Sequence, residues 1–270
     1  QETATGLRHE LKPPPRAEVW DAVNADSSSC SRKHCDCEKC FYQRARARLR
    51  TAHVIIVNHA LLFALINSGG AQANGANTDA RGVLFADDFV VLDEAHTVPD
   101  VATENFGLSL SSYGVDRALK YLYNPRTKRG LLRKHGGPEV QQLVLDALEA
   151  SQLFFDFVAS SLLTQRPVVR VREAGVAENT LEGPLGALHR LIGKAADKLE
   201  DGRERDELLE QKLRVKSIAA AIDEWLTLAD KKHVYWAERS GRKQTIVTLR
   251  SAPIDVAPEL RKHLFGCGTS

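Results

Sequence analysis

Apolar positions follow two different periods along this chain. His53–Val57 and Phe89–Leu92 are short, nearly all-apolar runs that stop at polar residues. Runs of this length are typical of strands buried on both faces of a parallel sheet. Residues 67–81, between them, are rich in Gly, Ala and Asn, which predicts a mobile surface loop. The first hundred residues therefore favour a domain built on a parallel sheet.

The pattern changes to helical spacing after about residue 100. Apolar side chains then recur every three or four residues, which predicts amphipathic helices. The segments with this spacing are Glu139–Gln165, Glu182–Ala195 and Arg205–Ala229. On the last segment we expect an apolar stripe of Leu209, Leu213, Ile218, Ile222, Trp225 and Leu226. This block is typical of a helical insertion.

Strand patterns return near the end of the chain. Val234–Glu238 and Gln244–Leu249 are β-prone runs separated by Ser240-Gly241-Arg242, and this arrangement predicts a hairpin. Ala257–Phe265 then predicts a short helix.

Composition and charge exclude several classes of protein. The chain has 270 residues, 43% hydrophobic and 27% charged, which excludes a wholly disordered or fibrous chain. It has neither a signal-peptide pattern nor an apolar run near the ~20 residues that span a bilayer, so we expect no membrane partner. With a net charge of +2, any basic surface must be local. Because the chain contains no Met, we expect it to be an internal piece of a longer protein.

Two adjacent carboxylates follow the second apolar run. Asp93 and Glu94 come directly after Leu92, and His96 lies two residues further on. Open α/β sheets bind ligands at the carboxyl ends of their strands. In nucleotide hydrolysis one carboxylate there holds Mg²⁺ through water and a second activates the attacking water. Because paired carboxylates are costly without a compensating cation, the pattern favours a nucleotide site over an ordinary surface turn.

Four cysteines lie close together before residue 41. Cys30, Cys35 and Cys40 are evenly spaced, with Cys37 between the last two. Thiolates at this spacing suit zinc or an iron–sulfur cluster, both of which take about four ligands. A disulfide knot and buried free cysteines are the alternatives, and a cytosolic chain favours metal over both. The ligand type alone does not distinguish zinc from iron–sulfur.

A basic segment follows the cysteines. Every second residue from Arg44 to Arg50 is basic, and Phe41 and Tyr42 come just before. Single-stranded DNA binds to such positive surfaces, with aromatic rings on which its bases stack. A solvated helix face is the alternative, and because alternating arginines do not share one face, about half of them would contact DNA.

These motifs resemble those of one family. Asp93-Glu94-Ala95-His96 resembles the DEAH form of the Walker B motif in superfamily 2 helicases. Cys40–Arg46 and Ala52–Leu62 resemble signatures of the DinG/XPD family of iron–sulfur helicases. Leu249–Val256 resembles the DinG segment that re-enters the motor before helicase motif III. The likeness covers both ends of the chain and leaves the helical block weakly matched.

The resemblance implies roles at the nucleotide site and the metal centre. Asp93 would serve Mg²⁺, Glu94 would be the catalytic carboxylate, and His96 would couple the nucleotide to the nucleic-acid site. A [4Fe–4S] cluster would be held by Cys30, Cys35 and Cys40. The fourth ligand would be a cysteine upstream of the chain, with Cys37 in reserve.

The resemblance also implies contacts with nucleic acid. We expect Tyr42, Arg44 and Arg46 to contact DNA, although Arg46 matches the family arginine beside the cluster and would instead stabilise the cluster electrostatically. Asn58 and His59 would lie on the DNA side of the motor, with a structural role as the alternative for His59.

The implied fold is α/β, with an incomplete RecA-like motor domain, its parallel sheet, and two insertions. We expect an iron–sulfur domain at residues 1–50, a motor segment at 51–100, a mostly helical arch at 101–233 and a return to the motor at 234–270. In the family, the arch and the iron–sulfur domain frame a hole for one DNA strand. The parent would then be an ATP-dependent 5′→3′ DNA helicase of DNA repair or replication.

The implied partners are ATP, single-stranded DNA and forked duplex DNA, bound by a monomer in the bacterial cytosol. Because the 270 residues contain no G-x-x-x-x-G-K-[ST] phosphate loop, we expect that this chain alone does not hydrolyse ATP. A zinc-dependent nucleic-acid-binding module without motor activity is the main alternative, since the four clustered cysteines form a complete thiolate set. A third interpretation is a parent that keeps a nuclease or regulatory role without helicase activity.

Overall fold

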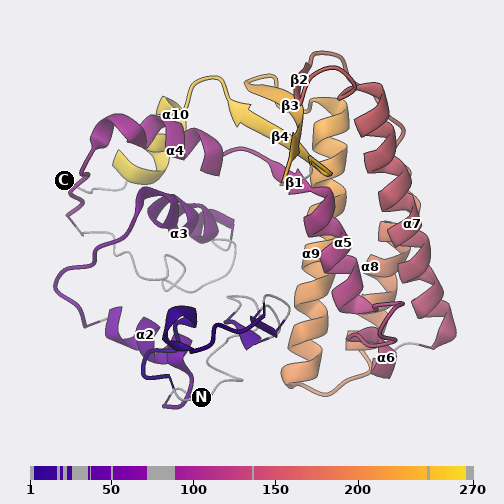
Figure 1. The fold of residues 1–270 in the computed structure, drawn as a ribbon, viewed down its shortest axis with the longest axis horizontal. Coiled ribbons are helices and arrows are strands. Elements are labelled where there is room, and N and C mark those ends of the chain that lie inside the picture. Colours follow the sequence, from indigo (N-terminus) through magenta and orange to yellow (C-terminus); the bar gives the residue numbers. More distant parts are fainter. Residues whose placement is uncertain are drawn as a thin grey trace. The chain divides into compact units, whose positions relative to one another are not determined.

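The structure is a computed structural model that describes residues 3–16, 19–20, 23–25, 36, 38–49, 51–71, 89–135, 137–241 and 244–265. Contacts between residues divide the chain into two units, residues 1–57 and 58–270. The described part is a mixed α/β fold that is mostly helical and contains one small sheet (Figure 1). No described helix combines the length and the apolar character needed to cross a membrane.

In the first unit an N-terminal segment packs on helix α2 (Phe41–Leu49). The backbone turns at Gly6, whose φ of +81° favours glycine. A Cβ at Gly6 would lie 2.6 Å from Cγ of Phe41, so the segment and the start of α2 are in close contact. The 3-10 turn η1 (Arg8–Glu10) follows.

Glu10 ties this N-terminal segment together. The hydroxyls of Thr3 and Thr5 donate to its carboxylate, and the backbone N–H groups of Ala4 and Thr5 donate to the same group at 3.0 Å. These bonds, the one from Thr3 foremost, lower the pKa of Glu10 from 4.5 to about 2.

The segment held by Glu10 should open in acid. Because the pKa of Glu10 is lower in the folded chain, its stabilising contribution is complete above pH 4.5 and is lost as the pH falls toward 2. We expect the NMR amide shifts of Ala4 and Thr5 to change over this range, and Thr3→Val to raise the pKa of Glu10. A Glu10 carboxyl that titrates at its ordinary value in the folded chain would contradict this prediction.

The second unit contains two apolar cores. The smaller one lies among α3 (His59–Ala71), α4 (Val98–Asn105), α10 (Ala257–Leu260) and the π-helical turn η3 (Arg261–Phe265). Its buried side chains are Phe63, Val98, Ala102, Leu260 and Leu264. Phe106, the residue after α4, lies edge-on to Phe63 and stacks on His263, with ring centroids 5.7 Å apart in both pairs.

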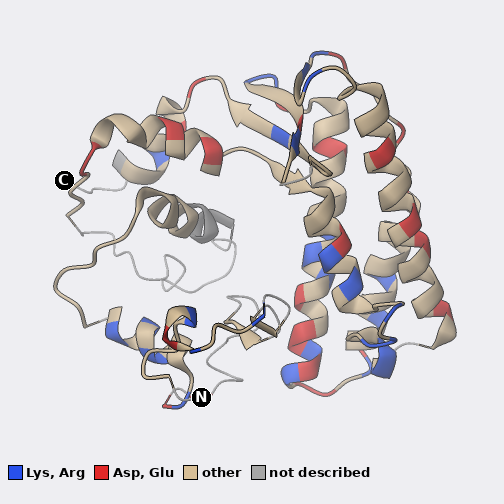
Figure 2. Ribbon diagram, viewed as in Figure 1, with Lys and Arg blue, Asp and Glu red and all other residues tan. Residues whose placement is uncertain are grey.

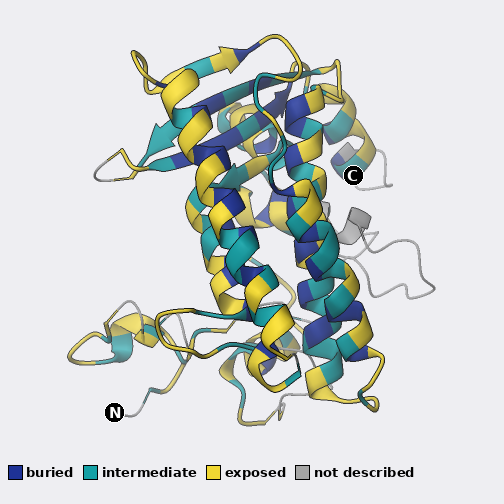
Figure 3. Cartoon of the chain, turned by 90° about the vertical axis from the view of Figure 1, so that its right-hand side faces the viewer, coloured by how far each residue is buried: buried dark blue, intermediate teal, exposed yellow. Residues whose placement is uncertain are grey.

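The larger core fills an antiparallel bundle of helices. The bundle is made of α5 (Ser112–Leu122), α7 (Pro138–Ser161), α8 (Glu182–Ala196) and α9 (Arg203–Thr227), with the short α6 (Leu132–His135) against α7. Charged residues are spread over the outer faces of these helices (Figure 2), whereas buried residues lie on the faces between them (Figure 3). Leu119, Phe154, Ile192 and Trp225 are almost fully buried and come one from each long helix, so a single core joins all four.

A four-stranded antiparallel sheet lies at one end of the bundle (Figure 1). Its strands are β1 (Ser109–Ser111), β2 (Val168–Val171), β3 (His233–Ser240) and β4 (Ile246–Pro253), in the order β1-β4-β3-β2. Tyr235 and Leu249 of the hairpin are buried in the bundle core. The indole N–H of Trp225 donates to the carbonyl of Trp236 at 3.1 Å, which fastens α9 to β3.

The segments with regular spacing are confirmed as helices and as a hairpin. The three predicted helices correspond to α7, α8 and α9, and the predicted hairpin to β3 and β4. Within α9 one prediction is wrong: Leu213 is 66% exposed, because it lies about 160° around the helix from the buried Val215. The prediction of a loop at residues 67–81 is also wrong for its first residues, because α3 extends to Ala71. The rest of the predicted loop lies outside the described residues.

The predicted parallel sheet is not seen in the described part of the chain. His53–Val57 and Phe89–Leu92 are in neither a helix nor a strand, and neither pairs with a described strand. Ile56 and Val91 are each 93% exposed, whereas Val90 contacts the smaller core. A strand needs a neighbour that accepts its backbone hydrogen bonds. The expectation that both runs are strands buried on two faces is therefore wrong here, and the sheet that forms is antiparallel and made by other residues.

The chain passes between the two cores at two adjacent points, which we call the neck (Gly107, Leu108 and Ser251). The N–H of Ser251 donates to the carbonyl of Leu108 at 2.9 Å, and the N–H of Leu108 donates to the Ser251 hydroxyl at 3.1 Å. A Cβ on Gly107 would lie 1.9 Å from the carbonyl oxygen of Ser251. Only glycine therefore fits where the two segments meet.

Gly107→Ala should destabilise the fold by about 1–3 kcal/mol, because the added methyl group forces the two segments of the neck apart. Urea unfolding followed by tryptophan fluorescence measures the loss. Gly186→Ala is the matched control, since Gly186 lies within α8 and its Cβ would meet only the flexible Arg190 side chain, at an ordinary contact distance of 3.6 Å. This control should be neutral or stabilising by up to about 1 kcal/mol. Equal stability of the two variants would argue against a close contact at the neck.

Candidate functional site

Asp93 and Glu94 form a sharp turn between residues 89–92 and α4. Glu94 has φ 49° and ψ 44°, a left-handed conformation that costs a residue other than glycine of order 1–3 kcal/mol. Its N–H donates to Oδ1 of Asp93 at 3.0 Å. Its carbonyl accepts from the N–H of Thr97 at 2.9 Å and from the Thr97 hydroxyl at 3.0 Å. Local hydrogen bonds thus hold the backbone of this turn, and the 3-10 turn η2 (Ala95–Thr97) leads directly into α4.

The side chains of this turn face solvent. Glu94 is 71% exposed and His96 is 76% exposed, with Nδ1 of His96 3.3 Å from Oε2 of Glu94. The pair is ionic only when His96 is protonated. Asp93 is exposed as well. Adjacent, accessible carboxylates suit a hydrated divalent cation such as Mg²⁺, which keeps several of its waters when proteins bind it.

Asn58 and His59 belong to the start of α3. The Asn58 side-chain oxygen accepts from the N–H of Leu61 at 2.8 Å, so Asn58 caps the helix. Nδ1 of His59 lies 3.1 Å from the hydroxyl of Thr97, the residue whose N–H and hydroxyl close the turn at Glu94. The structure therefore brings this predicted pair to the carboxylate turn, although 38 residues separate His59 from Thr97.

The basic segment forms α2, in the other unit. The Arg44 guanidinium lies over the ring of Phe41, and that of Arg46 over the ring of Tyr42, both at 5.8 Å. Arg44 is exposed and Arg46 half-buried. These cation–π contacts place positive charge and aromatic surface together, the combination that single-stranded nucleic acid binds. They also cover part of each ring.

Cys40 is described, whereas Cys30, Cys35 and Cys37 lie outside the described residues. The backbone of Cys40 precedes α2, and its carbonyl accepts from the N–H of Arg44 at 2.9 Å. A half-exposed thiol at a helix N-terminus is compatible with a thiolate ligand, because the helix dipole favours negative charge there. Over the described residues alone, no group of three or more potential ligands is assembled.

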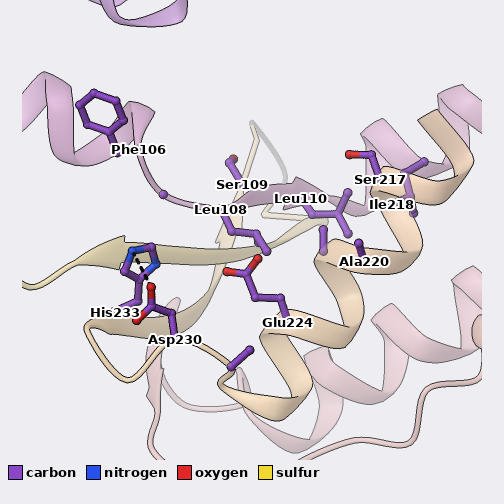
Figure 4. Close-up of a pocket in the computed structure, with 13 residues that line it drawn as sticks. Phe106, Leu108, Ser109, Leu110, Ser217, Ile218, Ala220, Glu224, Asp230 and His233 are labelled. Atoms are coloured by element: carbon purple, nitrogen blue, oxygen red, sulfur yellow. Dashed lines mark ion pairs between the residues drawn. The ribbon is translucent and has the colours of Figure 1, made fainter. Parts of the chain in front are cut away.

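The sequence interpretation missed a cavity of about 780 Å³ beside the neck (Figure 4). Glu224 of α9, Asp230 of the following turn and His233 of β3 lie around it, with Nε2 of His233 3.8 Å from Oδ2 of Asp230. Burial raises the pKa of Tyr235, whose hydroxyl accepts from the N–H of Asp230 at 3.0 Å. The walls come from segments far apart in sequence, so no local pattern indicated the cavity.

Comparison with known proteins supports a relationship to DNA helicases over part of the chain. No protein-family model matches. The chain is 33% identical over 100 residues to the ATP-dependent DNA helicase YoaA of Escherichia coli K12, a stretch that is 36% of this chain and 14% of that protein. It is 37% identical over 89 residues to the ATP-dependent DNA helicase DinG of Photobacterium profundum, which is 32% of this chain and 11% of that protein.

The DinG of Escherichia coli K12 is 30% identical over 105 residues, 38% of this chain and 13% of that protein. The matched stretch is thus a small share of each relative's length. This chain is partly homologous to DinG and YoaA helicases, and the likeness is that of a fragment.

Asn58→Ala should destabilise the second unit by about 1 kcal/mol, because it removes the cap of α3. Asn58→Asp keeps a capping oxygen and serves as the control. Urea unfolding measures both variants, and amide hydrogen exchange at Leu61 shows whether the loss is local. An alanine variant as stable as the aspartate variant would exclude the capping role.

Proposed function

We propose that this chain is a segment of an ATP-dependent DNA helicase of the DinG type. The observation that carries the proposal is the homology of about 100 residues to proteins that are named ATP-dependent DNA helicases. The exposed turn of Asp93, Glu94 and His96 supports it, since it presents the residue types that nucleotide hydrolysis needs on an ordered backbone.

In this proposal the carboxylate turn belongs to the nucleotide site. Asp93 would hold Mg²⁺ through water, and that ion would offset the charge of the phosphates. Glu94 would orient the attacking water and accept its proton. His96, 3.3 Å from Glu94, and His59, through Thr97, would connect this turn to the DNA side. The absence of a phosphate-loop motif from the 270 residues means that the chain alone is not expected to hydrolyse ATP.

The cysteine segment would hold a [4Fe–4S] cluster. Thiolates are the ligands of such clusters, and the position of Cys40 at the start of α2 fits one of them. Cys30 and Cys35 would supply two more, and Cys37 or a cysteine from elsewhere in the parent would supply the fourth. Bound there, the group would serve as a rigid, positively flanked element at the DNA.

The DNA contacts would lie on both insertions. On α2, Arg44 and Arg46 would meet phosphates, and Tyr42 offers a face for stacking. The proposed layout is an iron–sulfur domain at residues 1–50, motor segments at 51–100 and 234–270, and a helical arch at 101–233. The hairpin of β3 and β4, which this layout gives to the motor, packs on the core of the bundle. The bundle of α5, α7, α8 and α9 supports the helical character of the arch.

The metal content of the chain tests this proposal against the zinc module. Purified without oxygen, the 270-residue chain should be brown and contain iron and acid-labile sulfide in equal amounts. Cys40→Ser should lose the iron, because it removes a ligand. Cys267→Ser is the control and should keep the iron, because Cys267 lies far along the sequence from the four clustered cysteines.

The variant Cys37→Ser shows the source of the fourth ligand, since iron is lost only if Cys37 is a ligand. Colourless protein with one zinc ion per chain would contradict the iron–sulfur assignment and support the zinc-dependent module without motor activity.

A further inference from the structure

Basic side chains gather on one side of the hairpin formed by α8 and α9, which we call the α8–α9 basic face. Its members are His189, Arg190 and Lys194 on α8, and Lys212 and Lys216 on α9. Figure 2 shows basic positions on α8 and on the middle turns of α9. On each helix the two cations are four residues apart, a spacing at which like charges repel and destabilise a helix.

Close packing of the two helices brings these charges together. Gly193 is buried in α8, and a Cβ on it would lie 2.9 Å from Nζ of Lys212. The Lys212 side chain therefore crosses α8 at the glycine. His189 lies one turn earlier on the same helix, so it shares this side with Lys212.

The cations of this face have no ion-pair partner in the described part of the chain. Elsewhere on the same bundle cations are paired: Lys120 lies 2.8 Å from Asp116, Arg205 2.8 Å from Asp201, and Lys134 3.6 Å from Glu204. Neither Lys212 nor Lys216 has an acidic residue three or four positions away. On α8, by contrast, Lys194 has Asp197 three positions on, so the charge that no carboxylate of its own helix compensates is that of Lys212 and Lys216.

The pKa of His189 responds to the same excess of positive charge. Burial and then the charges of Lys212, Lys216 and Arg190 lower the pKa of this imidazole. The charged groups that act on it come from both helices and are all basic. The part of this lowering that the three cations cause marks a positive potential, and such a potential attracts an anion.

We propose that the α8–α9 basic face binds the phosphodiester backbone of single-stranded DNA. This inference rests on the proposed helicase function and assigns DNA contacts to particular residues of the helical block. Lys212 and Lys216 rise about 6 Å along α9, so they can meet neighbouring phosphates of one strand. α8 has no Phe, Tyr or Trp, and Trp225 of α9 is buried. The face therefore contacts phosphates and, unlike α2, does not stack bases. We expect it to bind without sequence preference.

The test follows the imidazole of His189 by NMR in the 270-residue chain, with and without an oligothymidylate. Phosphates bound at the face offset its positive charge, so the pKa of His189 should rise when the oligonucleotide binds. His135 is the internal reference, because it lies on α6, 3.5 Å from Glu204.

Variants of the two α9 lysines test the same contacts, both through the pKa of His189 in the free chain and through DNA binding. Lys212→Gln with Lys216→Gln should raise the pKa of His189 in the free chain. It should also lower the slope of log affinity against log salt by about 1.4, since each lost contact to a single strand removes about 0.7. Lys231→Gln with Lys232→Gln removes the same charge from the turn after α9 and should leave the slope unchanged. Lys212→Arg with Lys216→Arg keeps the charge and should keep the binding.

The outcomes separate this inference from the proposed function. A chain that binds the oligonucleotide with an unmoved His189, and with an unchanged slope in the double glutamine variant, overturns the inference and leaves the proposed function standing. A wild-type chain that binds no DNA overturns both. Urea unfolding confirms that the glutamine variant is folded, and it should be at least as stable as the wild type because a like-charge pair is gone.

Discussion

The close approach of two backbone segments at the neck is the constraint on which the second unit depends. Gly107 leaves no room for a side chain against the carbonyl of Ser251, and paired hydrogen bonds fix Leu108 beside it. The helical bundle and its sheet therefore begin and end at one place. The smaller core receives α4 from one segment and α10 from the other, so both cores depend on this contact. A block inserted in this way can change in length without disturbing what lies outside it.

The sequence predicted those elements whose pattern is local. The 3.6-residue period gave α7, α8 and α9, and the turn at Ser240-Gly241-Arg242 gave the hairpin of β3 and β4. The apolar runs at His53–Val57 and Phe89–Leu92 misled, because an all-apolar run indicates burial without saying which segments cover it. β1 and β2 are too short to show a period. They are strands because β4 and β3 accept their hydrogen bonds, which is a tertiary effect.

At the candidate site too, the sequence predicted local features but not contacts between distant segments. The adjacency of Asp93 and Glu94 is visible in the sequence, but the left-handed conformation of Glu94 and the contact of His59 with Thr97 are not. That contact between two side chains joins the carboxylate turn to the start of α3, beside the packing of α3 on α4 in the smaller core. Charges that are scattered along the sequence from Arg190 to Lys216 become a single surface only when α8 and α9 pack at Gly193. Patterns along a chain identify residue types, whereas packing decides which of them act together.

The half-covered segment before the carboxylate turn has a practical consequence. Val90 and Leu92 contact a core, while Phe89 and Val91 point outward, and the backbone between them pairs with no described strand. An exposed apolar segment without a described strand partner offers backbone groups to which another chain could pair. Association of this kind would grow with protein concentration, so the stability of a single chain is best measured in dilute solution.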